Sequence, residues 1–139
     1  RLKASHSLCD PAGFCGRCAH HNVAAGRPVL EGCGNFEVYA EINISPCAER
    51  SLCSSTTEVN DMCFFPQVSA LSKLYDSYPN ATWILTTRPA QHWVDSVTNW
   101  PGLQKGLISC NLSEFGLAPG AGAEDSELLS FFEAHNDRV

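Results

Sequence analysis

Eight cysteines constrain this chain more than any other feature of its sequence. Seven of them precede residue 64; the eight are Cys9, Cys15, Cys18, Cys33, Cys47, Cys53, Cys63 and Cys110. An even number at this density is typical of disulfide bonds formed in an oxidising compartment. Since eight cysteines can pair in on the order of a hundred ways, their spacing does not select one pairing.

Three acceptor patterns for N-glycosylation point to the same compartment. They are Asn43-Ile44-Ser45, Asn80-Ala81-Thr82 and Asn111-Leu112-Ser113. The first is the least favourable of the three, because Pro46 follows its serine. Together with the cysteines, these patterns predict a disulfide-bonded glycoprotein of the secretory pathway.

Composition limits the class of protein and of ligand. The chain has 139 residues, of which 44% are hydrophobic and 17% charged, as expected for one folded domain or part of a larger one. The formal net charge of −6 gives no basic face for nucleic acid, so we expect no nucleic-acid partner. An anion site in this chain has to be local.

The first half of the chain predicts little regular structure. Residues 1–35 are rich in Cys, Gly and His without a clear period, and we interpret them as a Cys-rich loop region held by cross-links. Residues 36–44 alternate apolar and polar side chains, which predicts a strand. Residues 45–65 predict an irregular, Cys-rich insertion.

The second half predicts helices around a buried strand. Val68, Leu71, Leu74, Tyr75 and Tyr78 share one face of a helix that starts at Pro66 and stops before Pro79. Residues 82–87 are apolar and rich in β-formers, which predicts a buried parallel strand. A helix follows Pro89, a short one covers about 103–108, a flexible link covers 116–122, and a last helix starts near Asp125.

This order of elements predicts an α/β fold with a partial parallel sheet flanked by helices. The domain division expected from it is a Cys-rich loop region at 1–35 and a partial α/β domain at 36–139. The three tryptophans fall at predicted strand and helix positions, so we expect Trp83, Trp93 and Trp100 in the core.

A candidate anion site lies where the predicted strand 82–87 meets the next helix. Ligands of open α/β sheets bind at the carboxyl ends of strands, and a helix start offers free N–H groups to phosphate. Arg88 supplies a permanent charge, and Thr87 precedes it. Ser96 lies nearly two helical turns beyond Pro89, on the same face and about 10 Å along the axis.

Ordinary structural roles compete with this interpretation. Arg88 could instead pair with Asp95 or bind a helix carbonyl, and Ser96 could be a surface serine or one bonded to the preceding turn. Spacing alone leaves both alternatives open.

The amino-acid sequence of this segment resembles that of the sulfotransferase family. The resemblance is carried by residues 78–89, which include Thr86-Thr87-Arg88-Pro89, and by Trp93-Val94-Asp95-Ser96-Val97. Residues 131–139, ending in His135-Asn136-Asp137-Arg138-Val139, are similar to a helix found downstream in many members. The similarity covers roughly residues 63–139, with Pro89 standing where many members have Asp.

The resemblance implies a P-loop-NTPase-like fold and a nucleotide co-substrate, 3′-phosphoadenosine 5′-phosphosulfate. It implies that Arg88 and Ser96 bind the donor's 3′-phosphate, with Thr87 beside them. It also implies transfer of a sulfuryl group to a hydroxyl or amine acceptor, a carbohydrate by our interpretation, in the Golgi lumen, with an extracellular location as the alternative.

One part of the family pattern is missing. The Gly-rich loop that holds the donor's 5′-phosphosulfate does not occur: Gly32-Cys33-Gly34 lacks the following Lys and hydroxyl residue, and no apolar strand precedes Gly13-Phe14-Cys15-Gly16-Arg17. We therefore expect a fragment that begins after this loop and does not transfer sulfate alone. No apolar run approaches about 20 residues, so we expect any membrane anchor outside this chain.

The catalytic base is not identified by the sequence. Glu37 and Glu41 share one face of the predicted strand 36–44, and His92 lies just beyond the candidate phosphate-binding turn. These three are the candidates, although solvated strand and helix faces explain them as well.

Two other classes of protein compete with the enzyme. The first is a non-enzymatic, disulfide-rich secreted interaction domain. The second is a zinc module, with ligands drawn from Cys15, Cys18, His20, His21 and Cys33. The second ligand pair is not cleanly spaced, so we expect disulfides and no metal.

Overall fold

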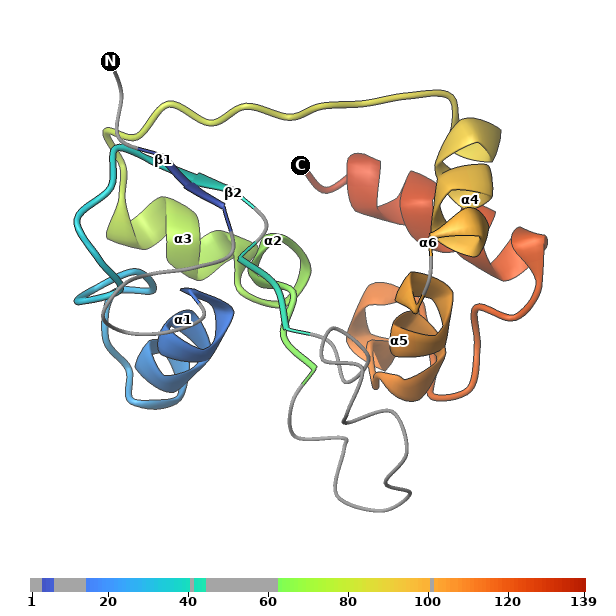
Figure 1. The fold of residues 1–139 in the computed structure, drawn as a ribbon, viewed down its shortest axis with the longest axis horizontal. Coiled ribbons are helices and arrows are strands. Elements are labelled where there is room, and N and C mark those ends of the chain that lie inside the picture. The colour runs from blue at the N-terminus through green and yellow to red at the C-terminus, as the bar shows by residue number, and fades with distance from the viewer. Residues whose placement is uncertain (1–3, 7–14, 41, 45–62, 101) are drawn as a thin grey trace. The chain divides into compact units, whose positions relative to one another are not determined.

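The computed structural model describes residues 4–6, 15–40, 42–44, 63–100 and 102–139, and these are mostly helical (Figure 1). The chain forms two compact units. The first comprises Arg1–Ile44 and Phe64–Thr82, and the second comprises Ser45–Cys63 and Trp83–Val139.

Helix α1 (Cys15–Ala24) lies in the first unit, where the sequence suggests loop, so that prediction is wrong for these residues. The buried positions of α1 include Cys15, Ala19 and Asn22, which recur at helical spacing. Small and polar side chains occupy them, so the helical period is not visible as a pattern of large apolar residues. The helix packs closely: a Cβ on Gly16 would lie 2.9 Å from the carbonyl carbon and oxygen of Asn43.

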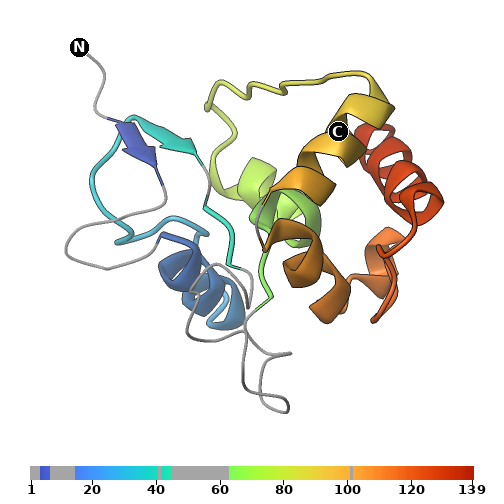
Figure 2. The same cartoon turned by 45° about the vertical axis from the view of Figure 1, so that its right-hand side comes forward.

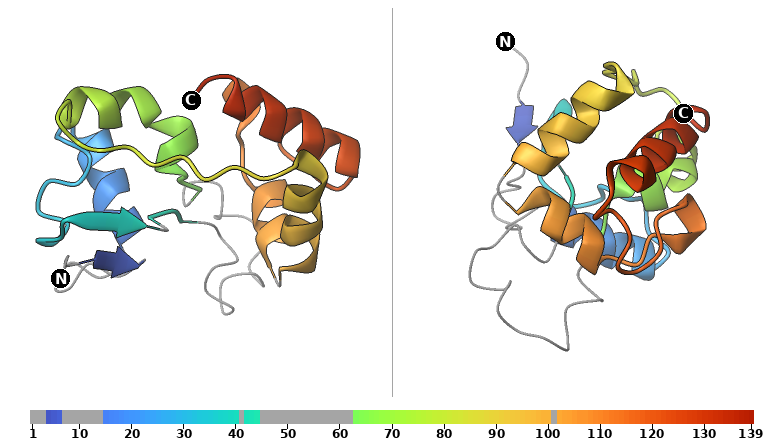
Figure 3. Two further views of the ribbon diagram at one scale, coloured as in Figure 1. Left: turned by 90° about the horizontal axis from the view of Figure 1, so that it is seen from above. Right: turned by 90° about the vertical axis from the view of Figure 1, so that its right-hand side faces the viewer.

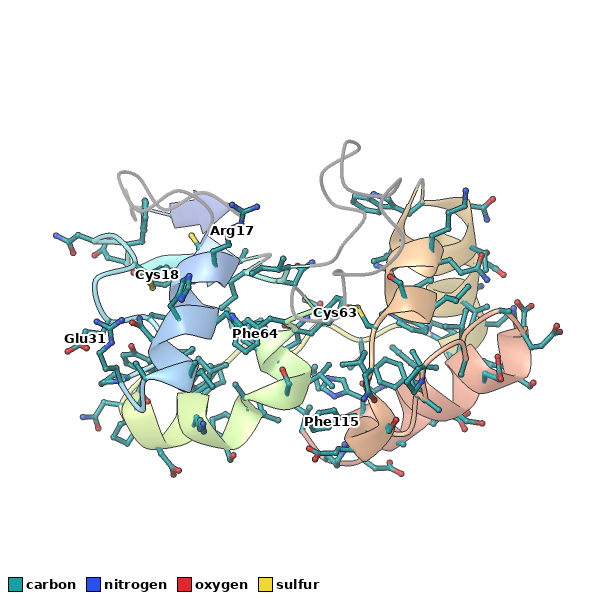
Figure 4. The ribbon with its side chains drawn as sticks, turned by 90° about the horizontal axis from the view of Figure 1, so that it is seen from below. Arg17, Cys18, Glu31, Cys63, Phe64 and Phe115 are labelled. Atoms are coloured by element: carbon teal, nitrogen blue, oxygen red, sulfur yellow. A yellow bond between two sulfur atoms is a disulfide. The ribbon has the colours of Figure 1, made fainter. Side chains whose placement is uncertain are left out.

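A disulfide joins α1 to the loop that follows it. Cys18 of α1, labelled in Figure 4, is bonded to Cys33. Beneath it, the fully buried Asn22 amide donates to the Val29 carbonyl at 3.1 Å and to the Glu31 carbonyl at 2.7 Å. The polar side chain in this small core is therefore satisfied by the loop backbone that it holds.

The sheet of the described residues is a single parallel pair. Strands β1 (Ala4–His6) and β2 (Val38–Ala40) run in the same direction, with Ser5 opposite Tyr39 (Figure 3). The predicted strand 36–44 is therefore shortened to three residues. Ile44 instead forms an isolated antiparallel bridge with Phe64.

Helices α2 (Pro66–Ser69) and α3 (Leu71–Ser77) replace the one helix predicted before Pro79. Pro66 takes the expected first position, and Leu74 is buried as expected. Ala70 interrupts the helix with φ −135° and ψ 21°. Beyond α3, the Tyr78 hydroxyl accepts a hydrogen bond from the Leu30 N–H at 2.8 Å, and burial raises the pKa of this phenol.

Residues 82–87 do not form the predicted buried strand. Residues 81–89 are exposed and lack regular structure, and no strand of the described chain pairs with them (Figure 1). Trp83 is 43% exposed, Ile84 83% and Leu85 50%. A strand becomes buried only between neighbouring strands and covering helices, which the described residues do not supply here.

The described part of the second unit is a group of helices that a disulfide joins to Cys63. It contains α4 (Ala90–Asn99), α5 (Leu103–Ser109), the 3-10 helix η2 (Ser113–Phe115) and α6 (Asp125–Asn136), which confirms the three helices predicted there. Its fully buried residues include Val94, Leu117 and Leu128. Cys63 is bonded to Cys110, the residue that follows α5 (Figure 4).

Two tryptophan predictions fail. Trp100, which follows α4, is 59% exposed, and Trp83 lies on the exposed segment described above. Trp93 is half-buried, as a residue on the inner side of α4. The predicted flexible link 116–122 is also partly packed, since the buried Leu117 pairs with Leu112.

Candidate functional site: the start of helix α4

The start of α4 offers unused backbone donors. Its first internal hydrogen bond runs from the Trp93 N–H to the Pro89 carbonyl, at 3.2 Å. The N–H groups of Ala90, Gln91 and His92 therefore have no acceptor within the helix. No side chain caps this end and its first turn carries no acid, so the positive end of the helix dipole is not neutralised locally.

Helix α6, in the same unit, shows the alternative arrangement. Glu124 and Glu127 form a capping box there, and the Glu127 carboxylate accepts the N–H groups of Gly122 at 2.8 Å and Glu124 at 3.2 Å. Those hydrogen bonds lower the pKa of Glu127. The start of α6 is thus satisfied by its own side chains, whereas the start of α4 is left for another acceptor.

Arg88 lies two residues before α4, with its side chain exposed. Within the described part of the chain, its guanidinium makes no hydrogen bond, ion pair or ring contact. Asp95, the alternative partner, instead accepts a hydrogen bond from the Gln91 side chain at 3.1 Å. Neither structural role considered for Arg88 is therefore observed with these residues. Thr87 is exposed beside it.

Ser96 is half-buried on α4, and its hydroxyl has no partner among the described residues. Other hydroxyls on helices of this chain bond to the preceding turn: Thr98 to the Val94 carbonyl at 3.1 Å, and Ser130 to the Ser126 carbonyl at 2.9 Å. Because Ser96 does not do this, its hydroxyl can donate to a ligand.

Buried residues fix the orientation of α4. Val94 and Val97 are 1% exposed and face the core. Helix α4 packs against α6 (Figure 2). Trp93 stacks on Phe132 of α6, with ring centroids 4.9 Å apart and the planes at 25°. This packing against α6 leaves Arg88 at the helix start and Ser96 on its flank, which is the arrangement that the helical spacing predicts.

The end of α6 is occupied with structural contacts. Arg138 donates to the Phe115 and Ala134 carbonyls, both at 3.0 Å, and its guanidinium lies 5.2 Å from the Phe115 ring centre. Burial and the nearby Arg138 charge lower the pKa of His135. The residues similar to the family's downstream helix therefore stabilise this unit through Arg138 and Phe115.

The two candidate bases that the structure describes belong to different units. Glu37 is exposed directly before β2 in the first unit, and His92 is exposed in the first turn of α4 in the second. Glu41 lies outside the described residues. No pair of these candidates lies on one described element.

The three cysteines considered as zinc ligands are held in disulfides. Cys15, Cys18 and Cys33 are all disulfide-bonded, so they do not offer the thiolates that the zinc alternative requires. No group of metal-ligating side chains occurs among the described residues. The disulfides instead indicate an oxidising, secretory compartment. In the described ranges, no helix has the length and apolar character needed to cross a bilayer.

A family model described as a sulfotransferase domain matches residues 35–108, just over half of the chain. The chain belongs to the sulfotransferase family. The match includes Arg88 and Ser96 and ends before α6. No curated protein and no solved structure matches this sequence. Membership makes the protein a sulfotransferase and implies the donor 3′-phosphoadenosine 5′-phosphosulfate.

The sequence predicts free N–H groups at the start of α4 but does not show which residues carry them. Pro89 is the signal that locates them, because a proline directly before a helix fixes which N–H groups lack acceptors. The backbone N–H groups of Gln91 and His92 therefore join the side chains of Arg88 and Ser96 in the candidate site.

Proposed function

We propose that this sulfotransferase binds the 3′-phosphate of its donor with Arg88, Ser96, Thr87 and the free N–H groups at the start of α4. The observation that carries the proposal is that Arg88 and the Ser96 hydroxyl have no partner in the described chain, although both lie within the family match. A doubly charged phosphate is the kind of acceptor that a guanidinium and the N–H groups of a helix start favour.

The reaction proposed is an in-line displacement at sulfur. The acceptor oxygen or nitrogen attacks the sulfur, the bond from sulfur to the bridging phosphate oxygen breaks, and adenosine 3′,5′-bisphosphate leaves. The acceptor's proton passes to a base. Arg88 and Ser96 hold the leaving nucleotide in position, which lowers the entropic part of the barrier.

Glu37, Glu41 and His92 are the candidates for the base. Substitution of the base by Gln is expected to lower kcat and change the pH–rate profile while nucleotide affinity is kept. A candidate whose replacement leaves kcat and the pH–rate profile unchanged is not the base.

The proposed acceptor is a carbohydrate hydroxyl or amine, and the proposed location is the Golgi lumen. The disulfides and the glycosylation patterns support a secretory location, where glycans are the abundant acceptors. Incubation of the full-length protein with labelled donor and a panel of glycans tests this, and labelling of non-glycan acceptors alone would refute it.

Nucleotide titration of the full-length protein tests the anchor directly. The titration compares adenosine 3′,5′-bisphosphate with adenosine 5′-monophosphate, which lacks the 3′-phosphate. Replacement of Arg88 by Ala should lower the affinity for the bisphosphate by roughly 10- to 100-fold, because hydrogen bonds to charged groups contribute about 1.5–3 kcal/mol each. Affinity for the monophosphate should change little. Ser96→Ala should have a smaller effect in the same direction.

Matched controls come from exposed residues of the first unit. Arg27→Ala removes an exposed arginine, and Ser72→Ala removes an exposed helical serine. Both should bind the bisphosphate like the wild type. Equal losses for the two nucleotides in Arg88→Ala, or no loss for either, would refute the 3′-phosphate role of Arg88.

A further inference from the structure

The three glycosylation patterns have different structural surroundings. The proposed transferase activity uses none of them, and a glycan on any of them would depend only on the compartment and on local structure. In two patterns the asparagine and the hydroxyl residue are both exposed, and in the third the asparagine is half-buried.

Asn80 lies in a tight turn directly after α3. The Ala81 N–H donates to the Tyr78 carbonyl at 3.0 Å, which closes the turn. Asn80, Ala81 and Thr82 are all exposed, and the chain after them has no regular structure. Both the acceptor amide and the required hydroxyl are therefore open to solvent.

Asn111 lies in a turn that already joins the two groups of the pattern. The Ser113 hydroxyl donates to the Asn111 side-chain oxygen at 2.7 Å, and the Ser113 N–H donates to the same oxygen at 3.2 Å. Leu112 between them is buried and fixes the turn, while Asn111 and Ser113 are exposed. The Asn111 nitrogen makes no hydrogen bond with the described residues.

Asn43 differs from both. Its carbonyl lies where a Cβ on Gly16 would approach to 2.9 Å, so its backbone is packed against α1. The next residue, Ile44, exchanges two backbone hydrogen bonds with Phe64, at 2.7 and 2.9 Å, as Leu112 does with Leu117 at 3.1 Å, so the bridge alone does not distinguish Asn43 from Asn111. Pro46 follows the serine of this pattern. Asn43 itself is half-buried, whereas Asn80 and Asn111 are exposed.

We infer that Asn80 and Asn111 carry N-linked glycans and that Asn43 does not. The co-reactant is an oligosaccharide linked to a lipid pyrophosphate, as the secretory pathway supplies it. The asparagine Nδ2 forms a bond to the anomeric carbon of the first sugar and loses one proton. The bond from that carbon to the pyrophosphate oxygen breaks, and the lipid pyrophosphate leaves.

Peptide mapping of the full-length protein from a eukaryotic secretory host tests this. Enzymatic removal of N-glycans in heavy-oxygen water converts each glycosylated Asn into a labelled Asp, which mass spectrometry locates. Label is expected at Asn80 and Asn111 and absent at Asn43. Asn99 is an exposed asparagine outside any acceptor pattern and serves as the unlabelled control.

Variants of the hydroxyl residue test whether each glycan depends on its acceptor pattern while the asparagine is kept. Thr82→Ala and Ser113→Ala should each abolish one glycan, whereas Thr82→Ser and Ser113→Thr should keep it. Absence of label at both Asn80 and Asn111 in the secreted wild type would overturn the inference, and so would label at Asn43.

Discussion

Arg88 and Arg138, the two arginines in the described part of the second unit, differ in what they contact. Arg138 places donors on the Phe115 and Ala134 carbonyls and lies over the Phe115 ring. Arg88 has no such partner among the described residues. A guanidinium carries five hydrogen-bond donors. Those of Arg138 stabilise the fold, whereas those of Arg88 are free to bind a ligand.

Gly16 gives a prediction at the scale of one residue. An alanine in place of glycine within a helix normally stabilises it by up to about 1 kcal/mol. Here the new Cβ would lie 2.9 Å from the Asn43 backbone and 2.7 Å from an Ile44 side-chain carbon. We therefore expect Gly16→Ala to lower the free energy of unfolding by about 1–3 kcal/mol, as measured by denaturant titration.

Ala24 is the matched control for Gly16. It is exposed at the end of the same helix, so Ala24→Ser adds one heavy atom where space is open. Its effect should be within about 0.5 kcal/mol. A stabilised Gly16→Ala protein would show that α1 does not pack against Asn43.

At the scale of elements, the sequence predicts helices better than strands. The helix after Pro89, the one near 103–108 and the one from Asp125 are all confirmed. Their apolar periods and flanking prolines and glycines are local signals, and a helix closes its hydrogen bonds locally. Helix α1 was missed because its buried face consists of Cys, Gly, Ala and Asn.

The wrongly predicted strand fails for the opposite reason. The apolar character of Trp83, Ile84 and Leu85 is a true local signal, but a strand also needs partners that the local sequence does not contain. The candidate site depends less on the sheet. Arg88 and Ser96 are related by helical geometry alone, so their arrangement could be predicted without knowing the strand.

Ile84 and Leu74 make this difference measurable in a protein of these 139 residues. Ile84 is 83% exposed, whereas Leu74 is 4% exposed on the inner side of α3. Ile84→Thr should change the free energy of unfolding by less than about 0.5 kcal/mol. Leu74→Ala should cost about 3 kcal/mol, because it leaves a cavity in the core.

The same pair of variants should differ in dye binding. Ile84→Thr removes exposed apolar surface, so the protein should bind less of a hydrophobic dye than the wild type. A loss of stability in Ile84→Thr comparable with that of Leu74→Ala would contradict the exposed position of residues 82–87.

At the scale of the whole molecule, the boundaries of the family match differ from those of the two compact units. The match to the sulfotransferase domain, residues 35–108, takes parts of both units and stops before α6. Among the described residues, the Cys18–Cys33 disulfide lies within the first unit and the Cys63–Cys110 disulfide within the second. The cross-links therefore stabilise units that the family sequence pattern does not separate.

Removal of each disulfide in turn tests whether its stabilising effect stays within its unit. Cys63 and Cys110 are 47 residues apart, whereas Cys18 and Cys33 are 15 apart. Loop-closure entropy then predicts losses of roughly 4 and 3 kcal/mol when each pair is replaced by Ser. Amide hydrogen exchange locates the loss: the Cys63→Ser/Cys110→Ser protein should exchange faster in α5, and the Cys18→Ser/Cys33→Ser protein faster in α1. Each variant is the control for the other, because faster exchange of both helices in both variants would show one cooperative unit rather than two.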